Sequence, residues 1–119
     1  MIKQNVYIIN YGMGNLRSVE NALKKLNCNC KIINDPNELD DSDKIILPGV
    51  GSFKTAINLL DKGGWINKIK YNVLEKKKNI FGICLGMQLL SDLSEENGVT
   101  KGLELISGEV KNLKNLGCK

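Results

Sequence analysis

The sequence predicts an α/β fold, in which a parallel sheet is covered by helices on both faces. Short apolar runs of strand length alternate with segments of helical period along the 119 residues. The strand runs are apolar almost throughout, which is typical of parallel strands buried on both faces. Three of these strands end in glycine-rich loops, the places where open α/β sheets bind their ligands.

The first part of the chain predicts a strand, a helix and two further strands. Residues 6–9 form a β-branched and aromatic run that leads into a glycine loop at 12–14. Apolar residues at helical spacing over 16–26 predict a helix that crosses back over the sheet. Residues 31–33 and 44–47 are the next strands. A turn is expected at Asp35 and Pro36, because the residue before proline avoids helical geometry.

The second part continues the alternation. Ser52 can cap a helix after the third strand, and Gly63 and Gly64 interrupt that helix before its pattern resumes at Trp65. Residues 79–83 are the fourth strand, followed directly by a helix over 85–93. Residues 102–116 are expected to add strands around a Ser107–Gly108 turn. The order is flavodoxin-like, and it ends without a helix to cover the last strands.

Composition excludes several classes of function. The net charge is +4, but the lysines are dispersed and only 5% of residues are aromatic, so nucleic acid is not an expected partner. No apolar run is long enough for a signal peptide or a membrane span, and we expect a cytoplasmic protein without a membrane partner. The spacing of the four cysteines does not match metal-binding knuckles, so free thiols and no metal are expected at Cys28, Cys30, Cys84 and Cys118.

The G-x-C-x-G segment from Gly82 to Gly86 lies at a strand-to-helix junction. This is the spacing of a nucleophile elbow, with the sulfur of Cys84 in place of a serine oxygen. Glycines two positions away on either side let the strand and helix backbones approach closely. The turn also puts the thiol at a helix N-terminus, which favours the thiolate. The alternative is that Cys84 is a small buried apolar residue.

A second glycine loop, from Pro48 to Phe53, follows the neighbouring strand. It offers backbone N–H groups where the tip of the elbow is expected, and one of them together with the N–H of Leu85 could stabilise an oxyanion. The alternative is a plain strand-to-helix turn capped by Ser52.

The first glycine loop, Gly12 to Gly14, has a different alternative. It resembles a dinucleotide-binding turn, with Asp35 about 20 residues later as the acid that would bind the ribose. Arg17 stands where the third glycine of that motif belongs, however, and its bulk opposes the close packing of helix on strand that a nicotinamide site requires.

Taken together, these loops resemble the glutaminase subunits of imidazole glycerol phosphate synthases, the HisH family of class I glutamine amidotransferases. The similarity runs through nearly the whole chain, with its motifs in family order. It is carried by five segments: Tyr11 to Val19, Pro48 to Phe53, Gly82 to Leu90, Ser94 to Glu96, and Gly102 to Val110.

The resemblance implies a reaction and a site. The Cys84 thiolate would attack the side-chain amide of glutamine, ammonia would leave, and water would hydrolyse the resulting thioester. Gln88 follows the thiol by one helical turn and therefore projects on the same face. Glu95 remains an alternative to its neighbour as the acidic residue. The implied glutamine-binding residues are Gln88 and Glu96, and the implied oxyanion and substrate loop comprises Gly49, Val50, Gly51 and Leu85.

The resemblance also implies a partner. The ammonia would pass to a synthase subunit of (β/α)₈-barrel fold, which with this protein forms a heterodimer that makes imidazole glycerol phosphate in histidine biosynthesis. No cofactor is implied. Two alternatives stay open: a paralogous amidotransferase that feeds another synthase, as in surface-sugar biosynthesis, and a non-catalytic α/β module that binds a nucleotide.

One departure from the family is large. Class I members use a Cys-His-Glu triad, and this sequence contains no histidine. We therefore expect residues 1–119 to be the N-terminal part of a single amidotransferase domain, incomplete at the C-terminus and inactive by itself. A degenerate, non-catalytic subunit is the alternative. Smaller departures are Glu104 and Ser107, where the family usually has glycine and proline.

Overall fold

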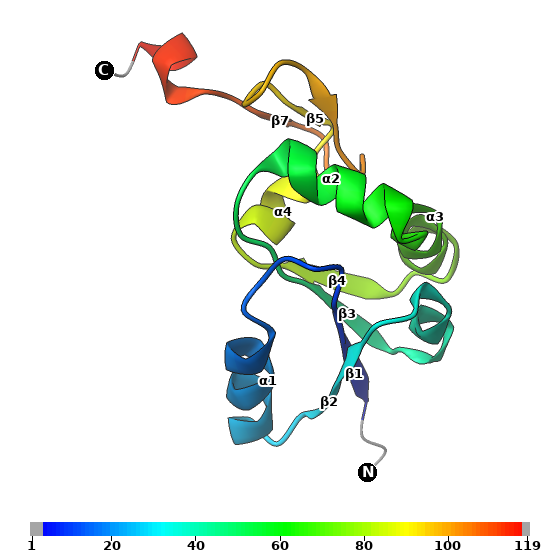
Figure 1. Ribbon diagram of the computed structural model, residues 1–119. Coiled ribbons are helices and arrows are strands. Elements are labelled where there is room, and N and C mark those ends of the chain that lie inside the picture. The colour runs from blue at the N-terminus through cyan, green and yellow to red at the C-terminus, as the bar shows by residue number, and fades with distance from the viewer. Residues whose placement is uncertain (1–3, 118–119) are drawn as a thin grey trace.

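The computed structural model describes residues 4–117 and contains a parallel sheet of four strands (Figure 1). The strand order is β2-β1-β3-β4, and every pairing within this sheet is parallel. The predicted α/β class and the flavodoxin-like order are therefore confirmed. The strands are β1 (Asn5–Ile9), β2 (Asn29–Ile33), β3 (Lys44–Leu47) and β4 (Asn79–Gly82).

Helices lie on both faces of this sheet (Figure 1). Val6, Ile8 and Ile46 point toward α1, while the alternate positions Ile9 and Ile45 join the core under the other helices. None of the helices within residues 4–117 is both long and apolar enough to cross a membrane. The helices that cover the sheet are α1 (Leu16–Lys25) on one face and α2 (Phe53–Lys62), α3 (Trp65–Lys70) and α4 (Leu85–Leu89) on the other.

Local capping explains where several helices begin. The Ser52 hydroxyl accepts a hydrogen bond from the N–H of Thr55 at 3.1 Å, so the predicted cap of α2 is confirmed. The turn expected at Asp35 is the start of a 3₁₀ helix, η1 (Pro36–Asp41). Asp35 is its extended N-cap and forms a capping box with Glu38, which is why the chain continues in helical form after the proline.

The chain after Cys84 departs from the prediction. The helix expected over 85–93 ends at Leu89, because the Ser91 hydroxyl donates to the Gln88 carbonyl and the next residues pair as strands. A small second sheet follows, in the order β6-β5-β7, in place of further strands on the main sheet. Its strands are β5 (Leu93–Ser94), β6 (Thr100–Lys101) and β7 (Glu109–Val110), and a 3₁₀ helix, η3 (Leu113–Leu116), comes after them.

Glu104 lies in the loop between β6 and β7 with a φ of 59°. This left-handed conformation is unfavourable for residues other than glycine. The departure at this position, where the related family usually has glycine, therefore places a strained residue in the loop.

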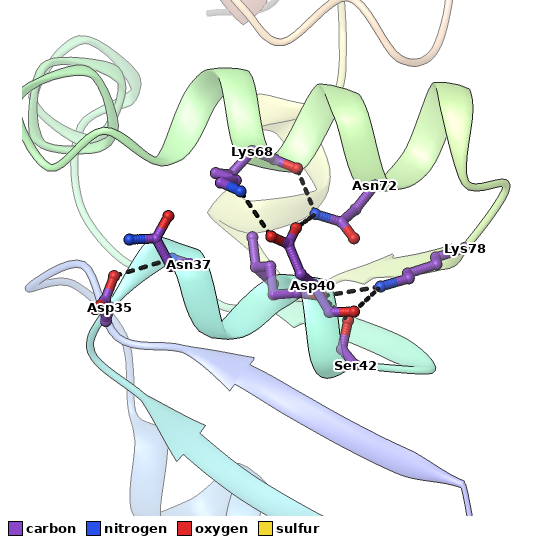
Figure 2. A network of polar contacts seen from close by, with 8 residues as sticks. Asp35, Asn37, Asp40, Ser42, Lys68, Asn72 and Lys78 are labelled. Carbon is purple, nitrogen blue, oxygen red and sulfur yellow. Dashed lines mark hydrogen bonds and ion pairs between the residues drawn. The ribbon is translucent and has the colours of Figure 1, made fainter.

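A polar network ties η1 to the helix that precedes β4 (Figure 2). The Asp40 carboxylate accepts hydrogen bonds from Lys68 Nζ at 2.7 Å and from Asn72 Nδ2 at 3.2 Å. The Lys68 hydrogen bond is the main reason why the pKa of Asp40 lies below its ordinary value. Asn72 is fully buried and belongs to a π-helical turn, η2 (Tyr71–Glu75), that continues α3.

Lys78 closes the other side of this network, directly before β4. Its Nζ donates to the carbonyl oxygens of Leu39 at 2.9 Å and Asp40 at 3.1 Å (Figure 2). The sequence alone favoured a simple dipole-complementing role for the lysines at the end of this helix. The structure shows that Lys78 instead satisfies the carbonyls at the end of η1.

We predict that Lys78→Met lowers the free energy of unfolding by about 1–2 kcal/mol, because two carbonyl groups lose their charged donor. Lys77→Met is the matched control, since the neighbouring side chain is exposed. Urea unfolding followed by circular dichroism measures both variants. Equal stability of the two variants would show that the Lys78 contacts do not stabilise the fold.

Candidate active site

Cys84 occupies the sharp turn between β4 and α4. Its backbone angles are φ 54° and ψ −120°, a strained combination for a residue with a side chain. The residue is exposed, and its thiol is free. The predicted elbow is therefore present, and the alternative of a buried apolar cysteine is wrong.

The two elbow glycines are required by close backbone contacts. A Cβ atom at Gly82 would lie 2.5 Å from the Cα of Met87, and one at Gly86 would overlap the carbonyl oxygen of Leu47. Any side chain at either position would push α4 away from the sheet. The glycine spacing thus has the steric cause that the motif indicated.

The loop from Pro48 to Gly51 lies beside the elbow, at the carboxyl end of β3. In this conformation the N–H of Leu85 donates to the carbonyl oxygen of Gly49 at 3.3 Å. This long hydrogen bond occupies the donor that the sequence suggested for an oxyanion. The Gly49 carbonyl has to turn away before the Leu85 N–H can face a substrate oxygen.

A pocket of about 540 Å³ opens at the Cys84 thiol. It brings together every residue that the sequence placed in the site, although they come from three separate segments of the chain. The loop after β3, the elbow and the segment after β5 each provide part of the wall. The predicted residues that line the pocket are Gly49, Val50, Gly51, Cys84, Leu85, Gln88 and Glu96.

The structure distinguishes the two neighbouring glutamates. Glu96 lines the pocket, and its backbone N–H donates to the Ser94 hydroxyl at 3.1 Å. Glu95 is not part of the pocket wall: its N–H donates to the Val110 carbonyl, and its carboxylate lies 3.8 Å from Lys111 Nζ. Glu96 is thus the carboxylate in position to meet a ligand beside the thiol.

Three further residues line the pocket and were not singled out from the sequence: Met87, Val110 and Lys111. Val110 and Lys111 reach the site because β7 pairs in parallel with β5. That pairing joins two strands of only two residues each, and no local sequence pattern predicts it. Met87 follows from the elbow itself, as the third residue after the thiol.

The other candidate residues have structural roles. Gly14 packs against Pro48, and the Asp35 carboxylate accepts the N–H of Asn37 as a helix cap. Cys28 and Cys30 are free thiols beside β2, while Cys118 lies outside the described residues. Within residues 4–117, no cluster of three or more His, Cys, Asp or Glu side chains could hold a metal ion.

Comparison with known proteins connects this geometry to a family. The family described as "Glutamine amidotransferase class-I" matches residues 7–118. The chain is 51% identical over 106 residues to imidazole glycerol phosphate synthase subunit HisH of Caldanaerobacter subterraneus subsp. tengcongensis, which covers 89% of this chain and 52% of that protein. It is 50% identical over 109 residues to the subunit HisH of Prochlorococcus marinus, covering 92% and 50%. The chain thus spans about half the length of these curated relatives.

Solved structures show the same fold. A crystal structure of a glutamine amidotransferase superposes with a TM-score of 0.76 at 23% identity, over 88% of this chain and 55% of that chain. A putative GMP synthase protein of Thermoplasma acidophilum superposes with a TM-score of 0.56 at 21% identity, over 74% and 43%. Both similarities support the arrangement of the sheet and its helices.

We predict that Gly86→Ala destabilises the protein by at least about 1–3 kcal/mol, because the new methyl group overlaps the Leu47 carbonyl. Gly98→Ala is the control. A methyl group at Gly98 would have no neighbour within 4 Å, so only the left-handed backbone penalty of about 1–2 kcal/mol applies there. Thermal unfolding and the alkylation rate of Cys84 measure the difference. A Gly86→Ala protein as stable as Gly98→Ala, with an unchanged thiol, would refute this account of the elbow.

Proposed function

The chain belongs to the class I glutamine amidotransferase family, and on that premise we propose that it carries the nucleophile of a glutaminase subunit of imidazole glycerol phosphate synthase. The observation that supports this most strongly is the strained, exposed Cys84 in one pocket with Gln88, Glu96 and a glycine loop. This combination suits nucleophilic attack on the side-chain amide of a bound glutamine.

The proposed reaction has two stages. The Cys84 thiolate attacks the amide carbon, and the carbonyl oxygen becomes an oxyanion that the N–H of Leu85 and an N–H of the 49–51 loop stabilise. The carbon–nitrogen bond then breaks, the nitrogen takes up a proton, and ammonia leaves a γ-glutamyl thioester on Cys84. Water attacks this thioester through a second oxyanion, releasing glutamate and restoring the thiol.

Substrate binding is assigned to the two polar side chains of the pocket. The Glu96 carboxylate is suited to the ammonium group of an amino acid, and the Gln88 amide offers both a donor and an acceptor. Lys111 lies between Glu95 and Glu109, at 3.8 and 3.4 Å from their carboxylates. It therefore compensates the negative charge of its neighbours, and Glu96 is left to attract the substrate.

The proton chemistry needs groups that these residues do not supply. Departure of the amide nitrogen requires a general acid, and acid–base help is worth about 10²–10⁴-fold. With no histidine in the sequence, no side chain here titrates in its ordinary state near neutral pH except a perturbed thiol. We propose that the chain is the N-terminal part of one amidotransferase domain, and that the triad His and Glu come from outside residues 1–119. The 119 residues by themselves would then show no turnover.

The ammonia needs a consumer. We propose a heterodimer with a synthase subunit of (β/α)₈-barrel fold, which uses the ammonia for the lyase reaction that forms imidazole glycerol phosphate in the cytoplasm. The HisH relatives support this assignment, since their names identify them as subunits of that synthase. No cofactor enters the proposed glutaminase reaction.

We predict that Cys84→Ala, in the assembled enzyme that contains this chain, abolishes glutamine-dependent synthesis and leaves ammonia-dependent synthesis intact. The reason is that only the glutaminase reaction passes through a bond to this sulfur. Cys28→Ala is the matched control, because that thiol lies beside β2 and away from the pocket.

Assays with glutamine and with ammonium salt, on the same protein preparations, distinguish the outcomes. Loss of both activities in Cys84→Ala would assign the residue a structural role. Retention of the glutamine-dependent activity would refute the proposed nucleophile.

A further inference from the structure

Tyr11, directly after β1, has its hydroxyl group in the interior behind the active-site loop. The residue is 7% exposed, and its Oη donates a hydrogen bond of 2.8 Å to the carbonyl oxygen of Pro48. Burial raises the pKa of Tyr11 to about 12. The hydroxyl therefore keeps its proton, and its ability to donate, throughout the pH range in which enzymes are assayed.

The turn that contains Tyr11 packs closely on the loop after β3. A Cβ at Gly49 would lie 2.7 Å from Tyr11 Oη, and a Cβ at Gly51 would lie 2.8 Å from the Cε of Met13. A Cβ at Gly14 would lie 3.0 Å from the Cβ of Pro48. Residues 11–14 thus form a wall against which the loop rests, and Tyr11 supplies the polar contact in it.

The loop has few other polar restraints. Within residues 4–117, the N–H groups of Val50 and Gly51 make no hydrogen bond, and Val50 is 55% exposed. The remaining polar tie is the 3.3 Å contact between Leu85 N–H and the Gly49 carbonyl, which has to break for catalysis. After that contact breaks, the Tyr11 hydrogen bond is the one fixed polar contact of the loop with the described residues.

We propose that Tyr11 is a positioning residue for glutamine hydrolysis: its hydroxyl holds the Pro48 carbonyl and thereby orients the N–H groups of the 49–51 loop toward the oxyanion. This inference rests on the proposed glutaminase activity. Tyr11 does not line the pocket and acts through the loop, without touching the substrate.

The expected effect follows from the role of the loop. Complete loss of one oxyanion donor costs about 10²–10³-fold in kcat in other enzymes. Loosening the loop leaves the donor present but less often in place, so Tyr11→Phe should lower kcat for glutamine by about 10-fold. KM should change less than about 2-fold, because Gln88 and Glu96, the assigned binding groups, belong to other segments.

The test uses the assembled enzyme that contains this chain, with Tyr7→Phe as the control. Tyr7 lies in β1, the strand that Tyr11 follows, but it does not line the pocket. Four quantities are measured: kcat and KM for glutamine, the ammonia-dependent synthase rate, the alkylation rate of Cys84 with iodoacetamide, and inhibition by an aldehyde analogue of glutamine. The aldehyde forms a tetrahedral adduct on the thiol and therefore needs the oxyanion donors, whereas alkylation does not.

The proposal expects Tyr11→Phe to lower kcat and to weaken aldehyde inhibition about 10-fold, with the alkylation rate and the ammonia-dependent rate unchanged. An unchanged kcat would overturn it. Equal losses in all four measurements would also overturn it, since they would indicate a general structural role. An unmodified enzyme that does not hydrolyse glutamine would instead refute the proposed function.

A second variant serves if Tyr11→Phe does not fold. A fluorinated tyrosine at position 11 has nearly the same shape but a more acidic phenol. As the pH rises through the lowered phenol pKa, the hydroxyl loses its proton and cannot donate to Pro48. The glutamine kcat of this protein should then fall with rising pH while that of the unmodified enzyme does not. Superimposable pH profiles would refute the positioning role.

Discussion

The close approach of α4 to β3 is the constraint on which the site depends. The carbonyl oxygen of Leu47 occupies the space that a side chain at position 86 would need, so the helix begins almost in contact with the sheet. The turn that joins β4 to this helix is consequently too short for relaxed backbone angles. Cys84 carries the strain, and its thiol points outward into the pocket.

The parallel sheet brings the other parts of the site to the same edge. β1, β3 and β4 all end there, so Tyr11, the Pro48–Gly51 loop and Cys84 become neighbours although they are far apart in sequence. The opposite edge is held by the Asp40 network, which joins η1 to the helix before β4 (Figure 2). The stable edge supports the sheet, while the catalytic edge keeps unpaired N–H groups available for chemistry.

Much of this arrangement was predictable because it depends on local rules. The elbow glycines, the Ser52 cap and the strand–helix alternation each follow from neighbouring residues. The short length of α4, the β5–β7 pairing and the place of Lys111 were not predictable, since two-residue strands carry no periodic signal. The same pairing decides between Glu95 and Glu96, which are equivalent in sequence but face different surroundings.

The central claim is that Cys84 is a nucleophile activated by its place in the fold. The most direct measurement treats the protein with an electrophilic glutamine analogue and locates the adduct by peptide mass spectrometry. The account predicts modification of Cys84 with protection by glutamine, while Cys28 and Cys30 stay unmodified. Equal modification of all the cysteines, without protection by glutamine, would contradict it.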